Sequence, residues 1–131
     1  MKNIILLSML MCSSAFAQIS LDNEIITLSN GIKIEKLTKT TKPASFTNGN
    51  ISVSYKGTLK NGFEFDSSKD QRVNFNLNNL ISCWKDAIPK LNVGEIAKIT
   101  CPSESAYGAR PLPGIPANSD LIFEIKLFSA N

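Results

Sequence analysis

Histidine is absent from the 131 residues of this chain. Its absence excludes Ser-His-Asp and Cys-His catalysis as well as zinc sites that use histidine ligands. Cysteine is scarce too, with three residues in the whole chain, and a structural zinc site normally needs four ligands. Most hydrolases and zinc proteins are therefore excluded, and we expect neither a metal nor another cofactor.

Long hydrophobic runs are also lacking. The most apolar stretch, 4–11, follows Lys2 and is shorter than the ~20 helical residues that cross a bilayer. It leads to Ala15-Phe16-Ala17, which matches the small-residue cleavage site of a secretory signal peptide. We therefore predict that residues 1–17 are a signal peptide, and that the protein is periplasmic or secreted without a membrane anchor. Acylation of Cys12, as in lipoproteins, is a weaker alternative because the preceding residue is a large methionine.

A strong excess of charge of either sign is missing as well. Without Lys2 the formal charge falls from +3 to +2, and the lysines are scattered along the chain. Nothing in this pattern indicates a nucleic-acid-binding surface. Residues 18–131 are enough for one domain with one packed core. Because no long N-terminal helical segment is present through which it could dimerise, we expect a monomer.

What the chain does contain is a series of strand-like alternations. From Ile51 to Leu59 apolar and polar residues alternate with the period of two that is typical of a strand with one buried face. Asn61-Gly62 follows, and because both residues tolerate positive φ this pair predicts a hairpin turn, with Phe63 and Phe65 beginning the returning strand. Other strands are predicted at Arg72–Leu77, Glu95–Cys101 and Leu121–Phe128, and a weaker edge strand at Leu28–Leu37.

One helix is predicted, where Trp84, Ala87, Ile88 and Leu91 fall at helical spacing. Ser82 is its expected N-cap, and Pro89 should shorten it. Strands and helices do not alternate as they do in a parallel βαβ fold. The sequence therefore predicts an α+β domain, in which an antiparallel sheet of about five strands wraps one short helix.

Several of these segments resemble the FKBP-type peptidyl-prolyl cis/trans isomerases. Ile51-Ser-Val-Ser-Tyr-Lys-Gly-Thr-Leu precedes the Asn61-Gly62 turn and then Phe65-Asp-Ser-Ser, in the order and spacing of the FKBP signature. The resemblance covers nearly all of the chain from Leu28 onward and implies an FKBP-like fold. Further similar segments are Phe75-Asn-Leu, Leu80-Ile81-x-x-Trp84, Ala97-Lys98-Ile99, Ala106-Tyr107-Gly108, Ile115-Pro116 and Leu121-Ile-Phe123-Glu124.

The resemblance also implies a proline-binding pocket with the indole of Trp84 as its floor. It makes Asp66 and Tyr107 the candidate catalytic residues: the Tyr107 hydroxyl and the Ile81 N–H would donate to the substrate carbonyl, while Asp66 would lie at the rim beside Tyr55. Phe75 is assigned to the core. The residues implied to bind substrate are Tyr55, Phe65, Val73, Leu80, Ile81, Trp84, Ile115 and Phe123.

Such a pocket suits rotation about an Xaa-Pro bond, whose barrier is about 18–20 kcal/mol because rotation breaks amide conjugation. No covalent bond is made or broken, so the catalyst need only favour the twisted amide over the planar one. We therefore predict an isomerase that assists folding of exported proteins with exposed Xaa-Pro bonds, with macrolide inhibitors as a further expected class of ligand. The alternative is a non-catalytic FKBP-fold module that binds a proline-containing partner or ligand.

The two hypotheses are supported by different parts of the sequence. Retained Asp66 and Tyr107 favour the enzyme. The segment 69–74, which borders the predicted pocket, is shorter than the family pattern, as is the overhanging loop around Arg110 and Leu112. A shortened border favours the binding module.

Cys83 and Cys101 are the cysteines that remain after removal of residues 1–17. An oxidising compartment favours their pairing. Cys101 shares a strand face with Ala97 and Ile99, against which the predicted helix packs. The resemblance places Cys83 where the family normally has the glycine before the tryptophan. A disulfide is therefore predicted, and two buried free thiols are the alternative.

Overall fold

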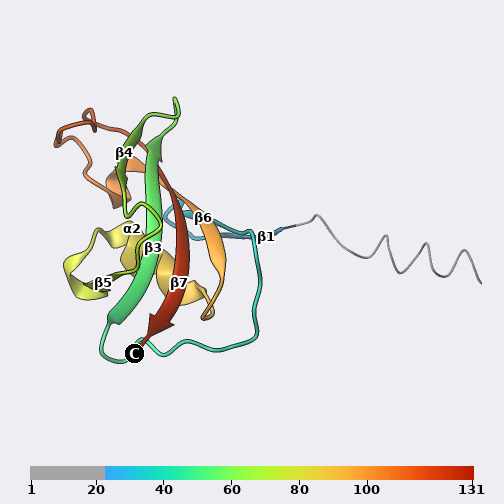
Figure 1. The fold of residues 1–131 in the computed structure, drawn as a ribbon. Helices are drawn as coiled ribbons and strands as arrows, with labels where there is room; N and C mark the ends of the chain where they lie inside the picture. Colours follow the sequence, from blue (N-terminus) through green and yellow to red (C-terminus); the bar gives the residue numbers. More distant parts are fainter. Residues whose placement is uncertain (1–22) are drawn as a thin grey trace, which may run out of the picture.

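The computed structural model describes residues 23–131, so the predicted signal peptide lies outside the described residues (Figure 1). The predicted α+β class is confirmed, but the sheet has seven strands and not about five. The strand that was not predicted comes from the N-terminal segment, which forms two strands and not one. The strands are β1 (Glu24–Thr27), β2 (Lys33–Lys36), β3 (Asn50–Leu59), β4 (Glu64–Ser67), β5 (Val73–Asn76), β6 (Ile96–Cys101) and β7 (Leu121–Ala130), and the helix is α2 (Ser82–Ala87).

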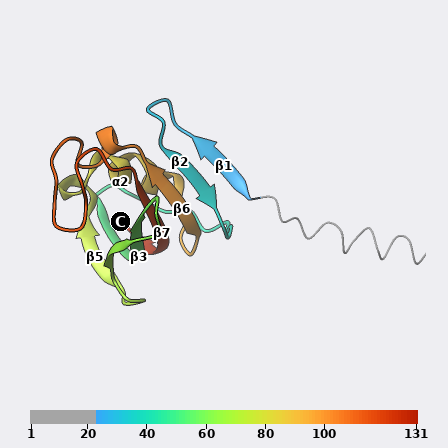
Figure 2. The ribbon, with the colours of Figure 1, turned by 90° about the horizontal axis from the view of Figure 1, so that it is seen from above.

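The sheet is antiparallel throughout and has the order β1-β2-β6-β7-β3-β4. The long strands β3 and β7 pair along their whole length at its centre. β3 has two partners on its other side, because β5 pairs with its first half and β4 with its second half. Viewed from above, the sheet curves around α2, which covers one of its faces (Figure 2). This curvature creates the concave side on which the pocket lies.

The N-terminal segment forms a hairpin where a single edge strand was predicted. The turn falls at Asn30-Gly31, where the Gly31 N–H donates to the Leu28 carbonyl at 3.0 Å and Gly31 has a φ of 89°. Its second strand, β2, pairs with β6 as well as with β1, so that β1 is the edge of the sheet. Asn30-Gly31 carries a turn signal in the sequence, but the short apolar alternation around it did not show that two paired strands would flank the turn.

The hairpin between β3 and β4 turns at Asn61-Gly62, as predicted. Gly62 has a φ of 90°, a conformation that costs a glycine little, and its N–H donates to the Leu59 carbonyl at 3.0 Å. Phe63 still belongs to the turn, because its carbonyl accepts from the Leu59 N–H at 2.9 Å and the returning strand begins at Glu64. The tip of this hairpin projects beyond the sheet (Figure 1).

The helix α2 is short and lies against the sheet. It ends at Ala87 and continues as the 3-10 turn Ile88–Lys90, because Pro89 has no N–H to extend an α-helix. The prediction that Ser82 caps it was wrong: Ile81 is the N-cap, and the Ser82 hydroxyl donates to the Ser105 carbonyl at 3.0 Å. All four residues that predicted the helix are at most 5% exposed, namely Trp84, Ala87, Ile88 and Leu91.

A disulfide joins α2 to the sheet. Cys83 and Cys101 are bonded, with their Cα atoms 5.8 Å apart, and both side chains are fully buried in the core. Cys101 ends β6, and Ala97 and Ile99 on the same face are buried with it. The bond therefore ties the residue before Trp84 to the strand beneath it.

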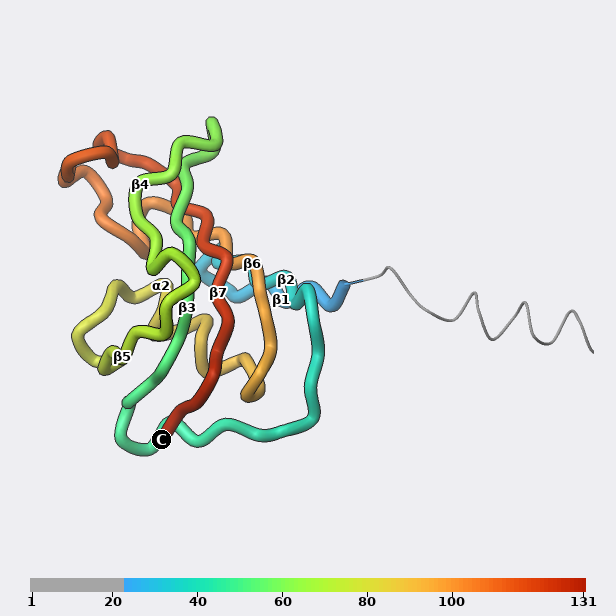
Figure 3. Tube along the Cα trace, in the orientation of Figure 1, coloured from blue at the N-terminus to red at the C-terminus, as the bar shows by residue number. Residues whose placement is uncertain are grey.

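The connection from β2 to β3 is long, and Figure 3 shows it passing the end of the sheet to reach β3 beside the C-terminus. Its start is held by a buried ion pair, in which the Lys36 ammonium lies 3.0 Å from the Glu95 carboxylate. The same carboxylate accepts from the backbone N–H groups of Thr40 at 3.0 Å and Asn92 at 2.8 Å. Across residues 23–131, the structure has no helix with the length and apolarity needed to cross a membrane.

Candidate active site

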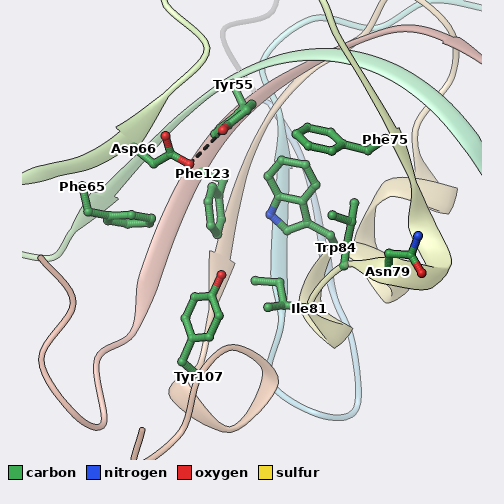
Figure 4. A pocket seen from close by; sticks show the side chains of 10 residues that line it. Tyr55, Phe65, Asp66, Phe75, Asn79, Ile81, Trp84, Tyr107 and Phe123 are labelled. Atoms are coloured by element: carbon green, nitrogen blue, oxygen red, sulfur yellow. Dashed lines mark hydrogen bonds between the residues drawn. The ribbon is translucent and has the colours of Figure 1, made fainter. Parts of the chain in front are cut away.

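An aromatic pocket of about 450 Å³ opens on the concave side of the sheet, beside α2 (Figure 4). Its walls come from β3, β4, β5 and β7, from the segment that enters α2, and from the loop after β6. Residues far apart in the sequence therefore meet only because the sheet curves around the helix. The lining consists of Tyr55, Phe65, Asp66, Phe75, Asn79, Leu80, Ile81, Trp84, Tyr107 and Phe123.

The indole of Trp84 forms the floor and is 5% exposed. Its ring meets those of Tyr55 and Phe123 edge to face, with centroid separations of 5.3 and 5.2 Å. Phe75 contacts it at 5.9 Å, and Phe65 packs on Phe123 at 5.6 Å. Edge-to-face contacts of this kind hold rings at defined angles, so the pocket has a rigid apolar lining.

Gly57 is what allows two of these rings to approach β3. A Cβ atom built on Gly57 would lie 2.6 Å from Phe65 Cζ and 2.9 Å from Phe123 Cε1. Gly57 pairs with Asp66 on one side and with Phe123 on the other, in the middle of β3. Any larger residue there would displace the rings that form the pocket wall.

One polar pair lies at the rim of the pocket. The Tyr55 hydroxyl donates to Asp66 Oδ2 at 2.8 Å (Figure 4). Asp66 Oδ1 accepts from the Ser67 N–H at 2.8 Å. The segment that follows β4 is hydrogen-bonded to β3, because the Tyr55 N–H donates to the Ser68 hydroxyl at 3.0 Å. Partial burial, followed by the hydrogen bond and the negative charge of Asp66, raises the pKa of Tyr55 to about 12. The phenol is therefore a neutral donor at physiological pH.

Tyr107 faces this pair from the opposite side. Its hydroxyl points into the space between Phe123 and Ile81 (Figure 4). It makes no hydrogen bond to any other residue that the structure describes, and the side chain is 36% exposed. It is thus a donor available to a ligand in the pocket.

The loop after β6, which carries Tyr107, is held in place by hydrogen bonds within the loop and to α2. Asp120 accepts from the Ser103 N–H at 3.0 Å, and the Ser103 carbonyl accepts from the Gly108 N–H at 2.8 Å. The Ser82 bond to the Ser105 carbonyl connects the same loop to α2. These contacts place Tyr107 relative to the helix that carries Trp84.

Two further N–H groups lie at the pocket. Ile81 is extended, with φ −60° and ψ 151°, and its N–H donates to no acceptor within residues 23–131. The indole N–H of Trp84 is buried and likewise has no acceptor in the described part of the chain. Apart from these donors and the rim pair, the lining is mostly apolar.

The family follows from comparison with known proteins. A model of the FKBP-type peptidyl-prolyl cis-trans isomerases matches residues 41–128. The chain belongs to this family. It is a peptidyl-prolyl cis-trans isomerase of the FKBP type, as the resemblance in the sequence implied.

Relatives and solved structures agree with this FKBP assignment. FK506-binding protein 1 of Candida glabrata is 40% identical over 111 residues, which cover 80% of this chain and 97% of that protein. A peptidyl-prolyl cis-trans isomerase from Pseudomonas syringae pv. tomato superposes with a TM-score of 0.75 at 35% identity, over 80% of this chain and 79% of that one. FkpA from Escherichia coli superposes with a TM-score of 0.73 at 33% identity, over 79% of this chain and 50% of that one.

The structure brings most of the residues implied by the FKBP resemblance into one pocket. Two of them do not line it. Ile115 is 6% exposed and packs in the core, where its backbone pairs with Leu112 in both directions at 2.9 Å. Val73 lies opposite Val53 at the start of β5 and outside the lining. The predicted residues that do line the pocket are Tyr55, Phe65, Asp66, Leu80, Ile81, Trp84, Tyr107 and Phe123.

Two lining residues were missed. Phe75 was assigned to the core, but it lies two residues after Val73 on β5 and lines the pocket, where its ring contacts that of Trp84 edge to face. The second is Asn79, a polar residue that directly precedes Leu80 in the sequence. The alternation around Phe75 predicted its strand, but it carried no signal that distinguishes a core side chain from a pocket wall. Among residues 23–131, no three His, Cys, Asp or Glu side chains are grouped as metal ligands.

Proposed function

We propose that this FKBP pocket binds the proline ring of an Xaa-Pro segment over Trp84 and twists the preceding amide. The observation that carries the proposal is a mostly apolar aromatic pocket lined by Tyr107, whose hydroxyl points into it, and by Ile81, whose N–H has no acceptor within residues 23–131. A proline ring has no donor of its own and suits an apolar floor. Its amide carbonyl needs a hydrogen-bond donor, and those two groups supply it.

The chemistry requires no proton transfer. A planar amide has a strongly polarised carbonyl, and removing it from water raises the free energy of the planar form more than that of the twisted form. Tyr107 and the Ile81 N–H then hold the carbonyl in the rotated position. Asp66 acts through the hydrogen bond that it accepts from the Tyr55 hydroxyl, and not as a base.

We propose further that the enzyme works on exported proteins. The sequence 1–17 has the organisation of a signal peptide, and β1 begins at Glu24, a few residues beyond the predicted cleavage site. The buried Cys83–Cys101 bond also supports an oxidising compartment, where disulfides persist. Its substrates would then be unfolded or partly folded polypeptides with exposed Xaa-Pro bonds.

Macrolide inhibitors are a second proposed class of ligand. They are suggested by the pocket and by the FK506-binding name of the yeast relative. We also propose a monomer, since the large exposed apolar side chains of the described residues are few and scattered: Ile25, Leu37, Phe63 and Tyr107.

A protease-coupled isomerisation assay on short Xaa-Pro-Phe peptides tests the pocket directly. We expect acceleration over the uncatalysed rate, and inhibition by rapamycin at stoichiometric concentration. The Trp84→Ala variant, which lacks the floor of the pocket, should lose most of the rate acceleration and most of the affinity for rapamycin. An uncatalysed rate in the folded wild-type protein, combined with tight binding of a proline-containing peptide, would instead support the non-catalytic module.

A further inference from the structure

Phe63 is a large apolar side chain exposed beside the pocket. It lies at the tip of the β3–β4 hairpin, and it is 53% exposed. This hairpin and the loop that carries Tyr107 stand at the same end of the molecule (Figure 1). A single exposed phenylalanine is unremarkable by itself, so its significance depends on what it adjoins.

The ring of Phe63 covers Gly114 on that loop. A Cβ atom at Gly114 would lie 3.4 Å from Phe63 Cε2 and 3.6 Å from Phe65 Cβ. Gly114 has a φ of 80° in a turn closed by the two Leu112–Ile115 hydrogen bonds, a conformation that favours glycine. At this point no side chain of the loop stands between Phe63 and Phe65.

Ring contacts lead from the floor of the pocket to Phe65, and the more exposed Phe63 adjoins Gly114 together with Phe65. Trp84 contacts Phe123 at 5.2 Å, and Phe123 contacts Phe65 at 5.6 Å. Phe65 and Phe63 then flank Gly114 together. Half-buried Leu112 and exposed Pro113 border the same turn. We call Phe63, Leu112, Pro113 and Gly114 the apolar rim.

We propose that the apolar rim binds an apolar side chain of the substrate polypeptide, two or three residues from the proline. This rests on the proposed function, in which the proline ring lies over Trp84, in the pocket that Phe65 also lines. Phe63 and Phe65 are two residues apart, a span of about 7 Å in extended chain. A substrate with its proline beside Phe65 advances by about 3.3 Å per residue, so its second or third neighbour reaches Phe63.

The chemistry of the rim sets the kind of segment it prefers. A phenyl ring and a proline ring offer apolar area without directional hydrogen bonds, so they select for apolar surface and not for one sequence. Segments with leucine, isoleucine or phenylalanine near the proline fit this surface. Such segments are exposed in unfolded chains and buried in folded ones, so the rim favours unfolded substrates.

Nuclear magnetic resonance exchange spectroscopy on nine-residue peptides with a central proline tests the proposal. In the first pair of peptides, the second and third residues before the proline are leucine in one peptide and serine in the other. In the second pair, the same change is made at the second and third residues after the proline. In one of the two pairs, the wild type should have a kcat/KM about three- to tenfold higher for the leucine peptide. Phe63→Ala should abolish that preference and leave the rate on serine peptides unchanged, while Phe63→Leu should retain most of it.

Ile25→Ala is the matched control, because Ile25 is also 53% exposed but lies on the edge strand β1. It should behave as the wild type, and far-ultraviolet circular dichroism should show every variant folded. If the leucine preference persists in Phe63→Ala, or if the wild type has no leucine preference, the proposed role of the apolar rim is wrong. Activity on the serine peptides would still support the proposed function of the pocket in that case. A wild type inactive on all four peptides overturns the proposed pocket and this inference with it.

Discussion

At the scale of single residues, the pocket consists of rigid rings and a few polar groups with separate tasks. The rings contact one another edge to face, so each restrains its neighbours. The polar groups either belong to the rim pair of Tyr55 and Asp66 or, like the Tyr107 hydroxyl, have no hydrogen-bond partner among residues 23–131. Deleting one polar group should therefore affect rate far more than folding.

Tyr107→Phe removes the hydroxyl and little else. We expect kcat/KM to fall by about five- to 150-fold, which corresponds to about 1–3 kcal/mol for one hydrogen bond to the transition state. Asp66→Asn should cause a smaller loss, because an amide oxygen can still accept from Tyr55. Asp70→Asn, in the turn just after β4 and outside the pocket lining, is the control. Unchanged rates in folded Tyr107→Phe and Asp66→Asn would refute the roles given to these groups.

Gly57→Ala tests the close approach of Phe65 and Phe123 to β3. Because the added methyl would lie less than 3 Å from both rings, the rings must move and the pocket must change shape. We expect kcat/KM to fall about tenfold, while the free energy of unfolding falls by about 1–2 kcal/mol. Ser54→Ala on the same strand, outside the pocket lining, should change neither quantity. Full activity in Gly57→Ala would show that the rings yield without cost.

At the scale of elements, two buried cross-links outside the pocket hold strands and helix of the fold together. The Lys36–Glu95 pair joins β2 to the turn before β6, and the Cys83–Cys101 bond joins α2 to β6. Both are buried, so each should matter to stability more than a surface contact would. Neither contributes a side chain to the pocket.

Glu95→Gln should reduce the free energy of unfolding by about 3 kcal/mol at neutral pH, because it leaves the buried Lys36 ammonium with only the more distant and more exposed carboxylate of Glu24, 3.9 Å away. Burial alone would raise the pKa of Glu95, but hydrogen bonds from Asn92, Thr40 and Lys36 outweigh it and hold the pKa below that of an ordinary glutamate. The stabilisation is thus complete above the unfolded-state pKa and is lost as pH falls through the lower folded-state pKa.

Urea unfolding of wild type and Glu95→Gln at pH 7 and pH 3 measures this effect. The difference between the two proteins should shrink at the lower pH. The double variant Lys36→Met with Glu95→Gln should recover part of the loss, since it removes both charges. Lys60→Ala, which breaks the exposed pair with Asp120, should have little effect. An equal difference at both pH values would contradict the assignment to Glu95 ionisation.

Reduction of the Cys83–Cys101 bond should lower the free energy of unfolding by about 3 kcal/mol, because the bond closes a loop between residues 18 apart. Thiol counting in denaturant, without reductant, measures the bond in protein purified from the oxidising compartment. No reactive thiol should be found before reduction and two afterwards. Two thiols before reduction would mean that both cysteines are free, and Cys83→Ala with Cys101→Ala would then match the wild type.

At the scale of the whole molecule, the question is where the mature chain begins. We expect export with cleavage after Ala17, so that the mature protein starts at Gln18. Intact-mass spectrometry of the exported protein measures this. Retention of residues 1–17, or added mass from acyl chains on Cys12, would refute the prediction.

Much of the fold could be predicted because its signals are local. The period-two alternation of Ile51–Leu59 reflects side chains on alternate faces of one strand, and Asn61-Gly62 reflects a φ that few residues adopt. The Asn30-Gly31 turn carried the same local signal, yet the pairing of β2 with both β1 and β6 did not follow from it. Strand partners depend on contacts between distant segments, which a single sequence pattern does not contain.

The candidate site divides in the same way. Most of its residues could be named from motifs shared with the FKBP family, because the residues that line the pocket lie within those motifs. Tertiary packing alone decided that Phe75 lines the pocket while Ile115 enters the core. It also decided that Ser82 bonds to Ser105 instead of capping its own helix. The physical reason is that the surroundings of a side chain depend on which distant element packs against it. Sequence periodicity indicates only the face of its own strand or helix on which the side chain lies.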